Sequence, residues 1–304
     1  MEHKTLEEAI EDFLVYQSSI RGLSDNSVVG YRNDLAKLAE SLGKDAALSV
    51  ITPQDLRHSI AALSRDKYAP ASINRYISAV RVLFAYCRRF EYIGQNPAEE
   101  IKTMKQPKTL PAFMTQSEVD ALCAEPERAE LLWASRDKAL FETLYSSGCR
   151  VSELASLAMS DLAEDCRSAI VRGKGNKERK VFFADDAADA LHAYLSERKL
   201  RIMAEKPVAE VFVNQKGTGL TSRGIRYVVA RYSGVEGTRR HVSPHAFRHT
   251  FATAMLSGGA DVRIVQELLG HTSVSTTQRY THISREHLMK VYQKAHPHGG
   301  LHDD

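Results

Sequence analysis

Apolar residues recur every three or four positions through the first 95 residues, with little of the strict alternation that strands produce. Helix start and stop signals divide this stretch into four or five amphipathic segments. The apolar stripes comprise Leu6, Ile10, Phe13 and Leu14, then Tyr31, Leu35 and Leu38, and then Ile73, Ile77, Val80 and Phe84. The pattern predicts a helical N-terminal domain over residues 1–95.

The helical pattern stops at residues 96–111, which read NPAEEIKTMKQPKTLP. Lys102, Lys105 and Lys108 are evenly spaced along this stretch. Because its prolines interrupt any regular element, we expect a basic interdomain linker. Such a linker would either close a clamp around a nucleic-acid duplex or serve as a solubilising tether.

A second domain is expected over residues 112–296, and it opens with the capping box Thr115-Gln-Ser-Glu118. Two short runs of strand-forming residues, 168–173 and 179–183, flank a tip rich in glycine and lysine and predict a β-hairpin. The other expected elements are a short strand at 210–213, helices near 185–203, 222–232 and 285–295, and a disordered tail over 297–304.

Two successive helices are predicted between Ser243 and Gly270. Ser243 is followed by proline, which is a strong helix start. Two glycines stop this helix, and Asp261 caps a second one that Gly270 ends.

His245, Arg248 and His249 lie off the apolar stripe of the first of these helices, so we expect them to face away from the core. His245 falls in the first turn, where free N–H groups and the helix dipole favour an anion. The residues therefore indicate either a phosphate site or a solvated helix face. Zinc binding by the two histidines is a third reading, but Ala246 stands where the zinc motif requires glutamate.

The composition is that of an ordinary soluble protein, with 43% hydrophobic and 26% charged residues and a net charge of +3. No apolar run approaches the roughly 18 residues of a membrane span, and the acidic N-terminus has no secretory signal. We therefore expect a cytoplasmic protein with no membrane partner. Its four cysteines form no CxxC pair, which argues against a zinc knuckle and a disulfide framework.

Basic residues of the N-terminal domain give a first indication of a partner. Lys67, Arg75 and Arg81 alternate with Tyr68 and Tyr76. Cations and aromatic rings in this arrangement could follow a phosphate backbone, although a basic helix face is more often simply solvated.

Five further positions carry chemistry in the second domain. Arg150 follows a glycine that breaks one helix, and Glu153 shares its face on the next. Lys174 lies between two glycines at the hairpin tip, where the backbone can approach a ligand closely. His271 follows a helix stop, and Tyr280 comes nine residues later. Taken singly, the charged residues are more typical of surface positions, and a tyrosine at a helix end is more often half-buried packing than a nucleophile.

Read in chain order, these positions resemble the tyrosine recombinase (phage integrase) family, and within it the bacterial Xer recombinases that resolve chromosome dimers. The segments that carry the resemblance are LYSSGCRVSELASL, GKGNKER, SPHAFRHTFATAML and VQELLGHTSVSTTQRYTH, and the similarity extends over essentially the whole chain. It implies a multidomain, mainly α fold, in which a SAM-like N-terminal bundle precedes an α+β catalytic domain with a small antiparallel sheet. Cys149 and Ala246-Phe247 depart slightly from the family pattern, which leaves the paralogue open.

The resemblance implies that Tyr280 is a nucleophile that forms a 3′-phosphotyrosyl link with DNA. A phenol of pKa ~10 needs a proton acceptor and nearby positive charge to act at neutral pH. Arg150 and Arg248 would neutralise the phosphate, and Glu153 would orient them. The remaining catalytic residues are His245 as base or acid, His271 as donor to a phosphate oxygen, and Lys174 as donor to the leaving hydroxyl.

The resemblance also implies the partners. The substrate is double-stranded DNA with paired half-sites, bound by a cyclic tetramer of this protein or of this protein with a second Xer-type recombinase. Strand exchange passes through a Holliday junction, and a DNA translocase of the division septum is an expected activator. No metal, ATP or other cofactor is expected. DNA contacts are expected from Lys67, Arg75, Arg81, Lys102, Lys105, Lys108, Lys177 and Arg179.

Other classes of protein stay open at this point. A type IB topoisomerase would use the same chemistry to relax DNA without a specific site. A plasmid or mobile-element integrase would differ only in its target. A zinc hydrolase is a weaker alternative, because the glutamate that its motif requires is absent. A DNA-binding regulator with an inactive catalytic domain is also weaker, because such a protein would lack one of the reacting groups, and all of them are present here. The helix at 285–295 would dock on a neighbouring copy or fold onto its own domain.

Overall fold

The computed structural model describes residues 4–105, 113–129, 133–173, 177–201, 208–232, 242–270 and 285–299. The chain divides into two compact units, Met1–Thr109 and Leu110–Asp304. None of the helices in these ranges combines the length and the apolarity needed to cross a membrane.

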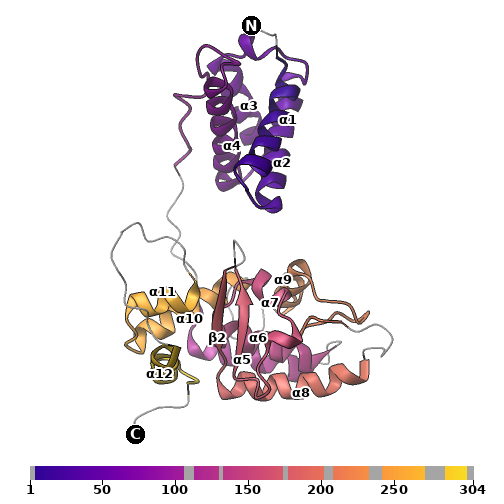
Figure 1. Cartoon of the computed structure of the whole chain (residues 1–304), viewed down its shortest axis with the longest axis vertical. Coiled ribbons are helices and arrows are strands. Elements are labelled where there is room, and N and C mark those ends of the chain that lie inside the picture. Colours follow the sequence, from indigo (N-terminus) through magenta and orange to yellow (C-terminus); the bar gives the residue numbers. More distant parts are fainter. Residues whose placement is uncertain are drawn as a thin grey trace. The chain divides into compact units, whose positions relative to one another are not determined.

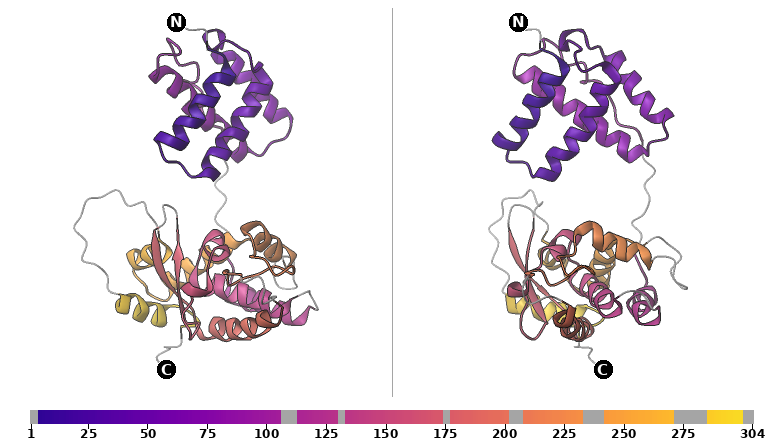
Figure 2. Two further views of the ribbon diagram at one scale, coloured as in Figure 1. Left: turned by 45° about the vertical axis from the view of Figure 1, so that its right-hand side comes forward. Right: turned by 90° about the vertical axis from the view of Figure 1, so that its right-hand side faces the viewer.

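The described part of the first unit is a four-helix bundle (Figures 1 and 2). Thr5 and Thr52 begin the first and third helices with capping boxes, which satisfy backbone N–H groups that a helix start leaves free. The predicted apolar stripes converge in one core, so the helical N-terminal domain is confirmed. The helices are α1 (Leu6–Val15), α2 (Asp25–Leu42), α3 (Pro53–Arg65) and α4 (Pro70–Arg89), with a π-helical turn at Tyr16–Ile20 and a 3₁₀ turn at Leu48–Val50.

The start of the predicted linker belongs to this first unit. Ala98 and Ile101 are buried in its core. Asn74 Nδ2 donates to the Met104 carbonyl at 2.9 Å, and Met104 N donates to Asn74 Oδ1 at 2.7 Å. A boundary at residue 96 is therefore too early, because the segment buries apolar groups that periodicity alone does not reveal. Residues 106–112 lie outside the described ranges.

The second unit is built around α6, which is buried along most of its length and packs against α5, α8 and α10. The mainly helical fold with a small antiparallel sheet is confirmed (Figure 2). Its elements are α5 (Gln116–Arg128), α6 (Ala134–Ser147), α7 (Val151–Ala155), a 3₁₀ turn (Met159–Asp161), β1 (Ser168–Arg172), β2 (Glu178–Phe182), α8 (Asp185–Arg201), α9 (Ser222–Arg231), α10 (Pro244–Ser257), α11 (Val262–Leu269) and α12 (Arg285–Ala295).

The predicted hairpin is confirmed, since β1 and β2 pair antiparallel with Val171 opposite Arg179. The strand predicted at 210–213 is wrong. Glu210 and Val213 form only isolated bridges, with Ala158 and Gly219. The apolar run there reflects complete burial of residues 211–213 in the core.

The C-terminal helix α12 folds onto its own unit (Figure 1). Tyr292 is buried, and its hydroxyl shares a hydrogen bond of 2.6 Å with Ser146 Oγ. The chain continues in contact with the unit: His296 is buried and stacks on Tyr292, and His298 Nδ1 lies 3.1 Å from Asp186 Oδ2. The prediction of a disordered tail is therefore wrong for residues 297–299, and residues 300–304 lie outside the described ranges.

Candidate active site

The turn between α6 and α7 places Arg150 at the start of α7. Gly148 ends α6 with φ of 57°, and a Cβ atom there would lie 2.6 Å from the Phe251 ring. Glycine is required on both counts, because other residues rarely adopt this φ and the adjoining core leaves no space. Arg150 then occupies the N-cap position of α7, with its backbone N–H bonded to the Glu153 carboxylate at 2.8 Å.

Glu153 is the buried anion of the site. Its Oε1 accepts from Arg150 Nη1 at 2.8 Å, and its Oε2 accepts from Arg179 Nη2 at 2.6 Å. The side chain is only 1% exposed, whereas that of Arg150 is 37% exposed. The Arg150–Glu153 pair predicted from spacing is present, but as a buried, charge-assisted network in place of an exposed pair.

Arg248 lies in the interior, although its helical position predicts an outward side chain. It is 8% exposed, and it donates from Nη1 to the Gly148 carbonyl at 2.8 Å and from Nη2 to the Leu269 carbonyl at 2.7 Å. Both acceptors are carbonyl groups that helix ends leave without an internal partner. The prediction of an outward side chain is wrong because the ends of α6 and α11 cover this side of α10.

Burial of the Arg248 guanidinium lowers its pKa to about 10, and the cations of Arg150 and Arg179 add to the decrease. The group stays protonated at neutral pH. Three arginines and Glu153 give this cluster a formal charge of +2, which suits it to a phosphodiester.

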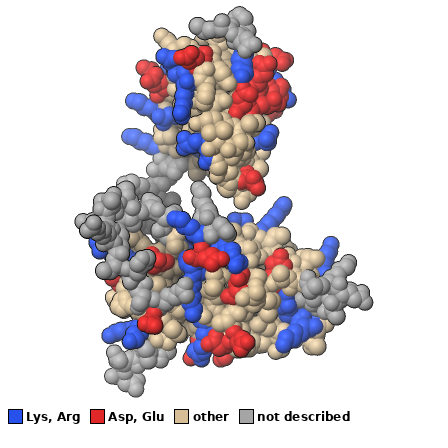
Figure 3. All heavy atoms as spheres, in the orientation of Figure 1, with Lys and Arg blue, Asp and Glu red and all other residues tan. Residues whose placement is uncertain are grey.

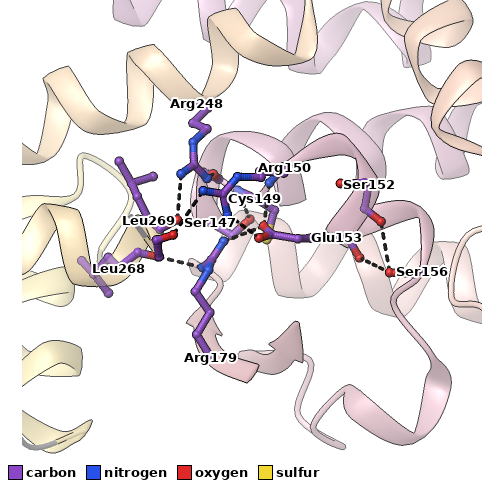
Figure 4. A network of polar contacts seen from close by, with 12 residues as sticks. Ser147, Cys149, Arg150, Ser152, Glu153, Ser156, Arg179, Arg248, Leu268 and Leu269 are labelled. Carbon is purple, nitrogen blue, oxygen red and sulfur yellow. Dashed lines mark hydrogen bonds and ion pairs between the residues drawn. The ribbon is translucent and has the colours of Figure 1, made fainter. Parts of the chain in front are cut away.

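Carbonyl groups at the end of α11 accept hydrogen bonds from all three arginines (Figure 4). Its last carbonyl groups carry the negative end of the helix dipole. The hydrogen bonds run from Arg179 Nη1 to Leu268 O at 2.7 Å, from Arg248 Nη2 to Leu269 O at 2.7 Å and from Arg150 Nη2 to Gly270 O at 3.1 Å.

His245 lies in the first turn of α10 and is exposed. Partial burial lowers its pKa, with the neighbouring His249 and Arg248 as further causes. The imidazole is therefore mainly neutral at pH 7 and can accept a proton. Within the described ranges, no three His, Cys, Asp or Glu side chains converge as metal ligands would.

We expect the imidazole of His245 to titrate below pH 6.5 in the free protein, because the lowered pKa keeps the neutral form in place as the pH falls. Histidine ring signals followed by NMR through a pH series would check this, with His245→Gln identifying the resonance. A bound phosphate should move the midpoint upward. A midpoint at or above 6.5 without DNA would contradict the assignment.

The structure therefore brings together Arg150, Glu153 and Arg248, with His245 one turn before Arg248 on α10. Four predicted site residues lie outside the described ranges, and their roles stay predictions: Lys108, Lys174, His271 and Tyr280.

The predicted DNA-binding residues of the first unit differ in their contacts and in their exposure to solvent. Arg75 is tied to the buried Asp34 by two hydrogen bonds of 2.8 and 2.9 Å. Tyr76 cannot contact DNA as the sequence suggests, because it is buried and its hydroxyl bonds to Ser59 at 2.9 Å. In Figure 3, Lys and Arg side chains gather over the α3 and α4 side of this unit. Exposed positions are occupied by Lys67, Arg81, Lys102, Lys105 and, in the second unit, Lys177.

Sequence reasoning assigned Arg179 to the DNA surface and missed its contact with Glu153. Its position in the hairpin indicates that the side chain faces inward. Arg179 lies two residues before Val181 and opposite Val171, both of which are buried, so the three share the inner face of the hairpin.

Family models match most of the chain. The model of the phage integrase family matches residues 112–287, and the model of the phage integrase N-terminal SAM-like domain matches residues 10–90. The matches cover both structural units.

Two relatives are similar over nearly their full length. Tyrosine recombinase XerC of Treponema denticola is 44% identical over 304 residues, covering 96% of this chain and 100% of that protein. Tyrosine recombinase XerD of Lacticaseibacillus casei is 40% identical over 292 residues, covering 95% and 99% respectively. The crystal structure of the XerH site-specific recombinase, bound to its difH substrate in a pre-cleavage complex, shares the fold with a TM-score of 0.69 at 22% identity, over 90% of this chain and 92% of that one.

Proposed function

We propose, from the premise that the chain belongs to the phage integrase family and is a tyrosine recombinase, that it exchanges DNA strands at a specific site through a phosphotyrosyl intermediate on Tyr280. The observation that carries this proposal is the arginine cluster around Glu153, with its net charge of +2. Such a site can hold one phosphodiester and stabilise the charge that develops on its oxygens.

The chemistry follows from the groups assigned. The Tyr280 oxygen attacks the scissile phosphorus and forms a phosphotyrosyl bond, while the bond from phosphorus to the 5′ oxygen breaks. His245, neutral at pH 7, accepts the phenolic proton, and Lys174 protonates the departing 5′ hydroxyl. Arg150 and Arg248 hold the phosphate oxygens throughout.

The phosphotyrosyl bond conserves the energy of the original linkage. A free 5′ hydroxyl from a partner duplex can therefore attack it and reseal the strand without ATP. Two such exchanges produce and then resolve a Holliday junction, with four protomers on two paired sites. We propose that these are copies of this chain, alone or with a second Xer-type recombinase.

The biological substrate that we propose is a site near the replication terminus, where exchange resolves chromosome dimers during cell division. The similarity to XerC and XerD over both units supports this choice. Activation by a septal DNA translocase stays a prediction of the same proposal, as does a cytoplasmic location.

A nicked suicide substrate tests the function directly. The protein is incubated with terminus DNA carrying a nick beside the cleavage position, so that the freed fragment diffuses away and the adduct accumulates. We expect a denaturant-resistant product joined through a 3′ phosphate at one base. Relaxation of supercoiled DNA that lacks any such site, with equal efficiency, would instead indicate a topoisomerase.

Chelation should leave strand cleavage unchanged, because guanidinium groups supply the positive charge on the phosphate. The measurement compares adduct formation with and without excess EDTA after dialysis against chelator. A restriction endonuclease that requires magnesium, assayed in the same buffer, confirms that chelation is complete. Recovery of cleavage only on addition of magnesium or zinc would favour a metal-dependent nuclease.

A further inference from the structure

Protein groups engage both terminal nitrogens of Arg179, and one of these groups is the buried carboxylate of the candidate active site. Nη2 donates to Glu153 Oε2 at 2.6 Å, and Nη1 donates to Leu268 O at 2.7 Å. The side chain is 14% exposed, and its Nε is buried without a partner among the described residues. These contacts tie the guanidinium to a buried carboxylate and to a helix-end carbonyl on the inner face of the hairpin.

The contact with Glu153 gives Arg179 an influence on Arg150. The two carboxylate oxygens of Glu153 accept from Arg150 Nη1, from Arg150 N and from Arg179 Nη2, at 2.8, 2.8 and 2.6 Å. A carboxylate that is 1% exposed has no solvent to fix its orientation. The rotation of this carboxylate, and with it the direction of the Arg150 guanidinium, is therefore set by both arginines.

The contact with Leu268 gives Arg179 a second influence, on the end of α11. Gly270 ends this helix with φ of 65°, and a Cβ atom there would lie 2.8 Å from Arg179 Cδ. The Arg179 side chain thus lies directly against the helix end. Arg248 and Arg150 hold the next two carbonyls of the same helix end, so a shift of α11 would move both.

We propose that Arg179 is a positioning residue for strand cleavage: it fixes the Glu153 carboxylate against the end of α11 and so orients Arg150 and Arg248, without binding DNA itself. The proposal rests on the proposed function, and it replaces the expectation that Arg179 contacts DNA.

The test is Arg179→Met, which keeps much of the side-chain volume and removes both donors. We expect single-turnover cleavage of the nicked substrate at saturating protein to fall by about 10²-fold, since small displacements of catalytic groups have effects of this size. Duplex affinity and its salt dependence should stay at the wild-type values. Lys180→Met is the matched control, because Lys180 is the exposed neighbour on β2 and its removal takes away the same charge.

A phosphate contact would give a different result. Affinity for the duplex would fall, the slope of log affinity against log salt would decrease by about one, and cleavage at saturation would be retained. That outcome, or wild-type cleavage by Arg179→Met, overturns the positioning role.

Two further variants separate positioning from folding. Arg179→Lys keeps the charge but has no fork to span two acceptors, so we expect it to stay at least about 10-fold impaired. Full recovery would show that charge alone matters and would overturn the proposal. Glu153→Gln combined with Arg179→Met should be no slower than the slower single variant, whereas independent effects would multiply. All rates are measured below the onset of thermal unfolding for each variant.

The proposed function can fail separately from this inference. If the wild-type protein yields no covalent product, the function is wrong and the positioning role falls with it. If the wild type cleaves and Arg179→Met cleaves equally well, only the positioning role is wrong.

Discussion

Tyr280→Phe is expected to bind terminus DNA as tightly as the wild type and to form no covalent adduct. The substitution removes one oxygen and alters neither the residues of the arginine cluster nor the predicted DNA contacts. Without that oxygen no bond to phosphorus can form, and strand exchange cannot begin. Gel-shift titration measures the binding, and denaturing electrophoresis of the suicide substrate measures the adduct.

The other tyrosines of the second unit make the test specific. Four of those that the structure describes are buried, and burial raises the pKa of each: Tyr145, Tyr194, Tyr232 and Tyr292. Tyr227 is 68% exposed and is therefore the alternative nucleophile to exclude. We expect Tyr227→Phe to form the adduct normally. An adduct that persists in Tyr280→Phe and disappears in Tyr227→Phe would overturn the assignment.

Local signals predicted most helices because their causes are local. The capping box at Thr115, the Ser243-Pro start of α10 and the left-handed Gly270 at the end of α11 all act within one helical turn. Residues 285–295 were predicted as a helix and form α12 with these bounds.

Long-range contacts account for the main errors about the site. Periodicity predicts an outward Arg248 because it describes only the residue's own helix, yet the two acceptors of Arg248 belong to the ends of α6 and α11. Arg179 was placed on the DNA surface for a similar reason, since Glu153 and Leu268 are 26 and 89 positions away in the chain. A charged residue on a buried face indicates a partner without identifying it.

The segments beside the boundaries of the two units escape sequence-based prediction for a related reason. Ala98 and Ile101 enter the first core, and His298 contacts the second unit, from segments whose composition is typical of linkers and tails. Their placement depends on surfaces formed by other helices, such as the Tyr145 ring and the Asp186 carboxylate against His298. Whether such a segment packs on its unit therefore depends on tertiary contacts, which its own composition does not reveal.

Arg248→Lys should lower single-turnover cleavage by about 10²–10³-fold, the effect of removing one well-placed donor at a developing oxyanion. Lysine keeps the positive charge but has a single nitrogen. It cannot hold the Gly148 and Leu269 carbonyls from two separate nitrogens as arginine does, nor keep a planar fork toward the phosphate. We also expect the free energy of unfolding to fall by about 1–3 kcal/mol, because a buried carbonyl loses its donor.

Arg198 provides the matched control for that stability loss. It is also 8% exposed, and its Nη2 donates to the carbonyls of Val208 and Glu210 at 2.8 and 2.6 Å, neither of which belongs to the arginine cluster. Arg198→Met leaves both of these carbonyls without their donor, so it should lower the unfolding free energy at least as much while cleavage per folded molecule stays at the wild-type rate. Chemical denaturation and single-turnover cleavage, measured on both variants, separate the two effects. Equal loss of cleavage in both would mean that Arg248 acts only through stability, and the phosphate would then need another partner.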